Sequence, residues 1–159
     1  MPADLIAHDL MSPSGSILIE GGVLTSIFAF RQLDPNVPES GGILLGFRRG
    51  PHIHVTAATT PQPGDAQSRY SFHRAESRHQ RFAYTHWASS NETGDYLGEW
   101  HTHPEPTPTP SGIDRAEWQK ICNERKVPML FLILGTSSPV WLGIGLPRSI
   151  NGRLFRTSR

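Results

Sequence analysis

The chain has 159 residues, a length typical of one domain with a core large enough to fold without a disulfide or a metal. Its 15 basic and 14 acidic residues leave a net charge of +1, which gives little support for a nucleic-acid partner. A single cysteine against eight histidines excludes an internal disulfide framework and a cysteine-based zinc cluster. Any metal must therefore be held by imidazole and carboxylate groups.

Strands are predicted where apolar residues run or alternate, and helices where they recur every three or four positions. Residues 1–15 show no clear pattern and are expected to be a loose start, and residues 59–70 form a polar loop. The predicted elements, in chain order, are a strand over Ser16–Glu20, a helix over Val23–Leu33, a hairpin of Gly41–Arg48 and His52–Ala58, a helix over 72–90, a strand over Asp95–His103, a helix over Ser111–Arg125, and strands over Met129–Leu134, Val140–Leu146 and Arg153–Thr157.

This mixture of strands and helices without strict alternation predicts an α/β or α+β fold, a mixed three-layer sandwich in a single domain over residues 1–159. The first residues are too polar for a signal peptide, and no apolar run approaches the roughly 20 residues that span a bilayer. The single cysteine favours a reducing compartment. We therefore expect a cytoplasmic protein with no membrane partner.

The most informative segment is Glu99-Trp100-His101-Thr102-His103-Pro104. His101 and His103 are two positions apart on a predicted strand, so their side chains leave the same face. Pro104 ends the strand and begins a proline-stiffened loop of seven residues that leads to Ser111. The two imidazoles therefore stand at a strand end, next to the start of the following helix.

Asp114 lies in the first turn of that helix, where it can point back toward the strand end. Two imidazoles and one carboxylate that meet at one point suit a catalytic zinc site with an open fourth position. Glu39, immediately before an apolar strand, offers a carboxylate that could serve as a base beside the metal without ligating it.

Each of these residues also has a plain structural explanation. Ser111-x-x-Asp114 before a helix resembles a capping box, and both roles can hold at once. A His-x-His pair on a strand is more often a solvent-facing stripe, and His52-Ile53-His54 has the same spacing with no Ser-x-x-Asp downstream. Glu39 alone would be an ordinary surface glutamate. The zinc hypothesis rests on the conjunction of the residues.

The complete pattern resembles the JAMM motif of the JAB/MPN metalloproteases, which is Glu, then His-x-His, seven residues, then Ser-x-x-Asp. Every position matches here, and the resemblance covers roughly residues 16–146. The segments Gly98–Pro104 and Thr60–Asp65 look more specifically like the bacterial branch of deconjugases. That branch accompanies ubiquitin-activating and ubiquitin-conjugating-like enzymes in antiphage defence operons, including those with a cyclic-oligonucleotide synthase.

The resemblance implies a role for each residue of the motif. His101, His103 and Asp114 would bind one Zn²⁺, Glu39 would be the general base, and Ser111 would stabilise the oxyanion together with zinc. It implies hydrolysis of an isopeptide or peptide bond after the extended C-terminal tail of a ubiquitin-like protein, or of a conjugated cyclic-oligonucleotide synthase. The fold would be a cytidine-deaminase-like β-sheet flanked by helices.

Several residues around the motif have more than one interpretation. Glu99, Glu105 or a backbone carbonyl could accept the second N–H of a zinc-ligating histidine. Trp100 is expected in the core rather than at the substrate, and Cys122 in the core rather than as a nucleophile. A set of arginines could steer an acidic partner or form a solvated helix face: Arg69, Arg74, Arg78 and Arg81.

Two other functions compete with a zinc-dependent deconjugating protease. A non-catalytic MPN scaffold would bind a ubiquitin-like partner without a need for the intact ligand set. A metallohydrolase for small amides would keep the ligands but would not cleave a protein conjugate. The sheet edge that takes the tail, the oligomeric state and the choice between precursor processing and conjugate removal stay open.

Overall fold

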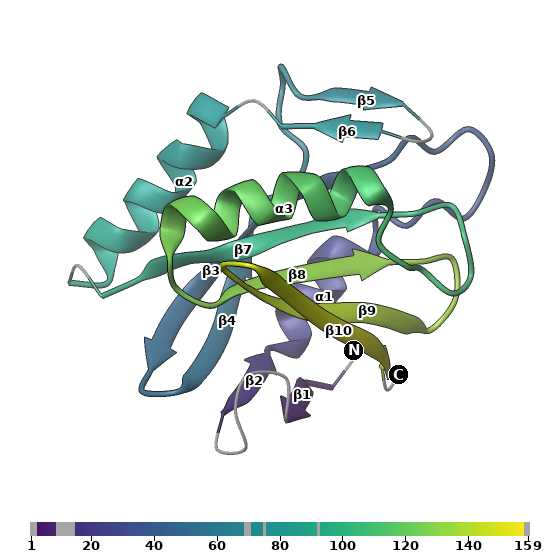
Figure 1. Ribbon diagram of the computed structural model, residues 1–159. Coiled ribbons are helices and arrows are strands. Elements are labelled where there is room, and N and C mark those ends of the chain that lie inside the picture. Colours follow the sequence, from purple (N-terminus) through teal and green to yellow (C-terminus); the bar gives the residue numbers. More distant parts are fainter. Residues whose placement is uncertain (1–2, 9–14, 69–70, 75, 92, 158–159) are drawn as a thin grey trace.

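The computed structural model describes residues 3–8, 15–68, 71–74, 76–91 and 93–157 (Figure 1). Three helices and ten strands lie within these ranges. Their bounds are β1 (Leu5–His8), β2 (Ser16–Ile19), α1 (Gly21–Phe28), β3 (Gly41–Arg49), β4 (His52–Ala58), β5 (Ala66–Ser68), β6 (Ser71–His73), α2 (Glu76–Ser89), β7 (Asp95–Thr102), α3 (Gly112–Arg125), β8 (Met129–Leu134), β9 (Pro139–Leu146) and β10 (Ser149–Arg156).

Among the described residues, eight strands form one mixed sheet in the order β1-β2-β4-β3-β7-β8-β9-β10, and β5 and β6 form a separate two-stranded hairpin. The β2–β4 and β7–β8 pairs are parallel, and the other pairs of the large sheet are antiparallel. Figure 1 shows α1 on one face of the sheet and α2 and α3 on the other. The predicted mixed sheet flanked by helices is confirmed.

The central strand β8 supplies the core on both faces because its run of six apolar residues is completely buried. Strand alternation divides these residues between two clusters. The cluster on the α1 side contains Leu130, Leu132 and Leu134 of β8 together with Val23, Leu24 and Ile27. The cluster on the α3 side contains Met129, Phe131 and Ile133 together with Trp118, Cys122 and Trp141. Burial of each such side chain contributes about 1.5–3 kcal/mol to stability. This burial holds β8 in place beside β7, the strand that carries His101.

The first strand is a correction to the sequence prediction. Leu5–His8 form β1, which pairs antiparallel with β2, whereas a loose start was expected over residues 1–15. Leu5 and Ala7 point into the core and their neighbours point to solvent. With only two buried residues, the alternation is too short to be recognised from sequence. Residues 1–2 and 9–14 lie outside the described ranges.

Helix α1 also differs in its bounds, because it covers Gly21–Phe28 rather than Val23–Leu33. It can begin at a glycine because the Gly21 N–H donates to Asp4 Oδ1 at 2.7 Å, a contact from a distant part of the chain. After Phe28 the backbone hydrogen bonds join residues three apart instead of four, such as Phe30 N–H to Ile27 O at 3.0 Å, and the helix ends.

Two further segments depart from the prediction. The expected polar loop over 59–70 contains β5, and β6 follows it, so α2 begins at Glu76 rather than at residue 72. Strand β10 begins at Ser149 rather than Arg153, because Arg148 takes a positive φ of 73° and turns the chain directly back onto β9. The remaining predicted elements agree with the structure to within one residue. No helix within the described ranges is long and apolar enough to cross a bilayer.

Candidate metal centre

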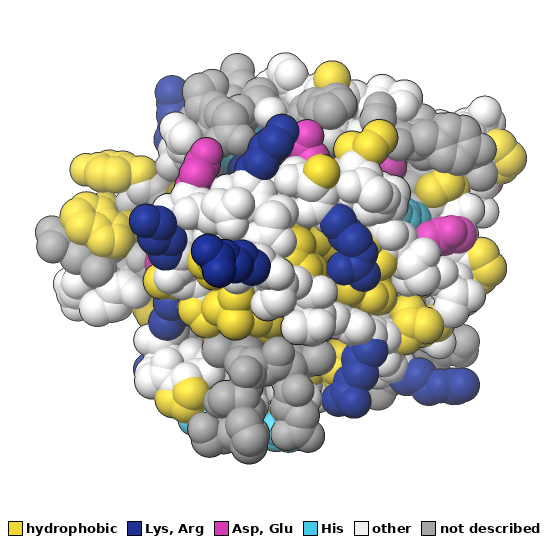
Figure 2. Space-filling view, in the orientation of Figure 1, with side chains coloured by type: hydrophobic (Ala, Val, Ile, Leu, Met, Phe, Trp, Pro, Cys, Tyr) yellow, Lys and Arg dark blue, Asp and Glu magenta, His cyan; other side chains and the backbone are white. Residues whose placement is uncertain are grey.

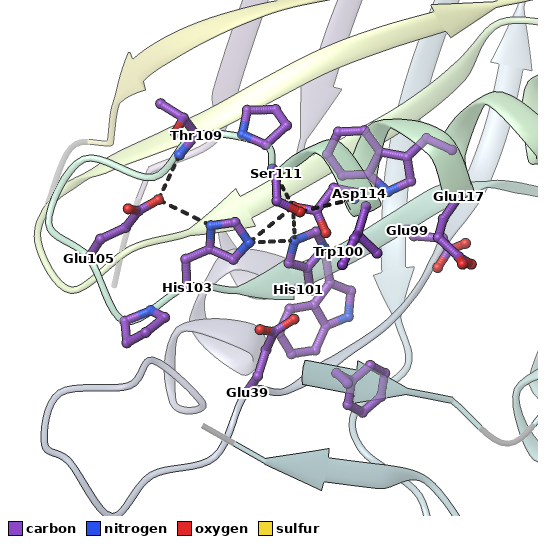
Figure 3. A pocket seen from close by; sticks show the side chains of 15 residues that line it. Glu39, Glu99, Trp100, His101, His103, Glu105, Thr109, Ser111, Asp114 and Glu117 are labelled. Carbon is purple, nitrogen blue, oxygen red and sulfur yellow. Dashed lines mark hydrogen bonds and ion pairs between the residues drawn. The ribbon is translucent and has the colours of Figure 1, made fainter. Parts of the chain in front are cut away.

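The two histidines of the motif stand where β7 ends, between two buried strands. His101 pairs with Gly41 of β3 on one side and with Ile133 of β8 on the other. His103 lies just beyond the strand, held by its N–H bond to Leu134 O at 2.9 Å. The two Nε2 atoms lie 3.1 Å apart and face the same point (Figure 3).

Asp114 reaches that point because Ser111 caps helix α3. The Ser111 Oγ accepts the Asp114 N–H at 3.0 Å, and the Ser111 N–H donates to Asp114 Oδ2 at 2.9 Å, which completes a capping box. The same Oδ2 lies 3.1 Å from His103 Nε2 and 3.4 Å from His101 Nε2. The capping interpretation is therefore correct, and the cap also aims the carboxylate at the histidines.

The spacing of these three ligand atoms can be compared with a zinc coordination shell. Zinc–nitrogen and zinc–oxygen bonds of about 2.0–2.2 Å place the corners of a tetrahedron about 3.3–3.6 Å apart. The three separations here are 3.1, 3.1 and 3.4 Å, within a few tenths of that edge. The donor set of His101, His103 and Asp114 thus fits one zinc ion and leaves a fourth corner open to the cleft.

Glu39 approaches the same point from the segment before β3. Its carboxylate and the nitrogens of both histidines lie within 4.8 Å of one another, and Glu39 is only 8% exposed. Burial raises the pKa of Glu39 to about 7, with the His103 charge acting against that rise and the Asp114 charge adding to it. A carboxyl group with a pKa near neutrality is suited to take and return a proton at neutral pH.

Burial and the neighbouring groups shift the pKa of each of the three candidate ligand residues in opposite directions. Burial holds the pKa of His101 below its ordinary value, although Asp114 acts in the other direction. Burial would also lower the pKa of His103, but hydrogen bonds to Asp114 and Glu105 outweigh it and raise that pKa. Burial would raise the pKa of Asp114, and the two histidines instead hold it well below its usual range. Asp114 is therefore an anion at neutral pH, as a metal ligand must be.

Glu105 accepts the second N–H of one ligand histidine. His103 Nδ1 lies 3.1 Å from Glu105 Oε1, which also accepts the Thr109 N–H at 3.0 Å. A proton on Nδ1 leaves the Nε2 lone pair directed at the site. Glu99, the other carboxylate considered, pairs with Arg74 at 3.4 Å. The sequence analysis considered both carboxylates as partners of a ligand histidine. The path of the proline loop brings Glu105, and not Glu99, to His103.

The site lies at the bottom of a cleft of about 670 Å³ between β7, α3 and the proline loop (Figure 3). Phe72 and Ile113 supply apolar surface at its wall, and Ile113 is 74% exposed. The remaining polar wall is strongly acidic, with the following carboxylates: Glu39, Glu99, Glu105, Asp114 and Glu117.

The other residues singled out from sequence are not among the candidate ligands, although Trp100 also lines the cleft. Trp100 and Cys122 are buried in the two core clusters, as predicted. Arg81 on α2 is exposed, while Arg69 and the side chain of Arg78 lie outside the described residues, so the arginine cluster stays a prediction. On the face that Figure 2 shows, Lys and Arg side chains are dispersed among polar and apolar ones.

Residues 23–144 match the family described as prokaryotic homologs of the JAB domain, and the chain belongs to this family. This membership confirms the resemblance that the motif indicated. A solution structure of a protein from Desulfitobacterium hafniense has the same fold, with a TM-score of 0.61 at 21% identity over 86% of this chain and 89% of that one.

Three similar relatives are each named CD-NTase/cGAS isopeptidase. The protein from Vibrio cholerae serotype O1 is 41% identical over 128 residues, and that from Escherichia coli is 36% identical over 129, in both cases 80% of each chain. The protein from Pseudomonas aeruginosa is 43% identical over 102 residues, which are 63% of this chain and 65% of that relative. The match therefore spans slightly less than two thirds of the Pseudomonas protein.

Proposed function

We propose that this protein is a zinc-dependent isopeptidase. It hydrolyses the bond after the C-terminus of a ubiquitin-like protein, or of a conjugated cyclic-oligonucleotide synthase, and so reverses or primes conjugation in antiphage defence. The observation that carries the proposal is the convergence of two imidazole nitrogens and one carboxylate oxygen within 3.4 Å, with a second, buried carboxylate beside them. The names of the relatives support the same substrate class.

His101 Nε2, His103 Nε2 and Asp114 Oδ2 would hold the metal. A bound zinc ion supplies a Lewis acid for the scissile carbonyl and brings the pKa of a bound water to about 7. Glu39 accepts the proton of the attacking water and delivers it to the leaving amine. Its buried position and raised pKa suit both transfers.

Ser111 stabilises the oxyanion of the tetrahedral intermediate. Its Oγ already accepts the Asp114 N–H, so the hydroxyl proton remains available to donate to a developing negative charge at the open side of the site. Ser111 is exposed at the cleft, within reach of a substrate carbonyl. The cap that aims Asp114 therefore also presents an oxyanion donor.

An extended protein tail is the substrate that suits this cleft. The site is open, so a chain can pass over the metal position with one carbonyl directed inward. The acidic wall disfavours nucleic acid and can accept the ammonium group of a lysine, the amine released from an isopeptide bond. Backbone pairing with a sheet edge is the usual way to hold such a tail.

The proposal is tested with a purified conjugate in which a cyclic-oligonucleotide synthase of the CD-NTase class is joined to a target through its C-terminus. Zinc-loaded protein should release the synthase with a free C-terminal carboxylate, seen by intact mass spectrometry. If the protein holds one zinc per chain yet cleaves no conjugate, the isopeptidase proposal is contradicted and a binding scaffold is favoured. Hydrolysis of small amides at the same rate as the conjugate would favour a small-amide hydrolase.

A further inference from the structure

A buried histidine–aspartate pair lies outside the metal centre and has no part in the reaction described above. His79 Nε2 lies 3.0 Å from Asp65 Oδ2 and 3.3 Å from Oδ1, and both side chains are completely buried. Asp65 Oδ2 also accepts the Gln62 N–H at 2.7 Å. A charge taken out of water needs such partners, because an unpaired buried carboxylate is strongly unfavourable.

The pair continues into the strands that carry the metal site. His79 Nδ1 lies 2.6 Å from Thr59 Oγ1, which accepts the Ile43 N–H of β3 at 2.8 Å. Thr59 O accepts the indole N–H of Trp100 in β7 at 2.8 Å. With the histidine proton on Nε2, the Thr59 hydroxyl donates to Nδ1, and every donor of this hydrogen-bond network has an acceptor. The network thus joins α2 to β3 and β7.

The other end of the network fixes the hairpin of β5 and β6, since Asp65 immediately precedes β5. In Figure 1 this hairpin lies beside the start of α2. Strand β5 in turn contacts the segment that carries the base. Ser68 O accepts the Glu39 N–H, and the Gln67 amide donates to Glu39 O at 3.1 Å and to Ser40 Oγ at 3.2 Å.

The base segment is held from its opposite side by the histidine strand. Ser40 N–H donates to Thr102 Oγ1 at 3.0 Å, and Thr102 N–H donates to Ser40 O at 2.9 Å. Thr102 stands between the two ligand histidines. Glu39 therefore sits at the junction of β7 and β5, and removing the β5 contacts leaves its backbone held on one side only.

We propose that Gln67 is a positioning residue for Glu39, and that the buried Asp65–His79 pair anchors the hairpin from which Gln67 acts. The inference rests on the proposed function, because it assigns Glu39 as the base. Displacement of a reacting group by about 1 Å can lower a rate about 100-fold, so a hydrogen bond that sets the backbone of the base affects turnover without touching the substrate.

The test compares Gln67→Met with Gln62→Met. Methionine keeps the length of the side chain and removes its N–H donors. Gln62 is a matched control because its amide donates to the nearby Thr60 O at 2.8 Å and contacts neither Glu39 nor Ser40. Gln67→Met should lower kcat about 10- to 100-fold with KM and zinc content unchanged, whereas Gln62→Met should retain the wild-type kcat.

A second readout needs neither metal nor substrate. Hydrogen exchange of the Glu39 and Ser40 amides should be about fivefold faster in Gln67→Met, the effect of one lost hydrogen bond, and unchanged in Gln62→Met. Asp65→Asn should accelerate exchange of the same amides through loss of the anchor. If it fails to fold, Gln67→Met remains the decisive variant.

The outcomes separate this inference from the proposed function. An inactive wild-type protein with faster Glu39 exchange in Gln67→Met would contradict the function and leave the positioning contact intact. An active wild-type protein with unchanged kcat and unchanged exchange in Gln67→Met would overturn the inference and leave the function intact. A fall in kcat of the same size in both glutamine variants would also overturn it.

Discussion

The chain contains two His-x-His sequences, one within β4 and one at the end of β7, and only the second brings its two imidazoles together. In β4, His52 Nδ1 accepts the Ser16 N–H at 3.1 Å, while His54 Nε2 lies 2.8 Å from Glu20 Oε2, so the two imidazoles serve different neighbours. At the end of β7 the Nε2 atoms of His101 and His103 lie 3.1 Å apart. The same spacing in sequence therefore keeps the imidazoles apart in one pair and brings them together in the other.

The position of each pair relative to the strand end explains the difference. Residues two apart in a strand are separated by about 6.5 Å, so parallel side chains cannot bring their nitrogens together. His103 lies one residue beyond β7 and is free of that constraint, whereas His52 and His54 both lie within β4. The capped start of helix α3 then brings the Asp114 carboxylate to the same strand end.

The largest expected effect comes from removing Asp114, the carboxylate partner of the histidine pair at the end of β7. Asp114→Ala should lose the zinc ion and all conjugate cleavage, because two neutral imidazoles alone hold zinc weakly. Glu20→Ala, which removes the carboxylate beside His54, should retain both. Metal analysis and cleavage assays on the two purified variants check this. Equal zinc content in the two variants would contradict the assigned ligand set.

Glu39→Gln should retain one zinc per chain and lose about 10²–10⁴ in kcat, because the amide cannot accept the water proton. Single-turnover cleavage with metal analysis on the same sample separates the two properties. Full activity of this variant on a conjugate would show that Glu39 is not the base.

Ser111→Ala should keep zinc and lose about 10²–10³ in rate, as for removal of one oxyanion donor. The same change removes a helix cap, at about 1 kcal/mol in the free energy of unfolding. Ser111→Gly distinguishes the two effects, because glycine is only a few tenths of a kcal/mol worse as a cap and yet lacks the hydroxyl. If Ser111 is the oxyanion donor, both variants cleave slowly, while the midpoint of thermal unfolding falls chiefly in the alanine variant.

Glu105→Gln should have the smallest effect, a zinc affinity weaker by about tenfold, because the neutral amide still accepts the His103 Nδ1 proton but polarises the ring less. Titration against a chromophoric chelator measures the affinity. Glu20→Gln is the control at the β4 pair, where no change is expected. An unchanged affinity in Glu105→Gln would remove Glu105 from the support of the ligand shell.

The sequence predicted the parts of this molecule that local pattern determines. The apolar runs of β8 and β9, the cap at Ser111 and the alternation that separates Trp100 from His101 are all local, and the structure has them where expected. The same local signals placed the motif residues at a strand end and a helix start. The motif suggested that the strand end and the helix start meet. The contact itself is made only in the folded sheet.

The features that were missed depend on distant contacts. Strand β5, with the sequence Ala-Gln-Ser and every residue exposed, has no strand signal and is fixed by Asp65 and by the backbone of Glu39. Helix α1 starts at Gly21 because its N–H donates to Asp4, which lies just before β1 and 17 residues earlier in the chain. The choice of Glu105 over Glu99 beside His103 depends on the path of the proline loop. None of these contacts leaves a periodic trace in the sequence.

A crystal structure of the zinc-loaded protein, with anomalous scattering data at the zinc edge, would locate the metal and its ligands. We expect one strong peak bonded to His101 Nε2, His103 Nε2 and the Asp114 carboxylate, with Glu39 beside the open corner and outside the ligand set, and no peak at His52 and His54. A zinc ion held by Glu39 in place of Asp114, or a peak at the β4 pair instead of the β7 pair, would contradict it.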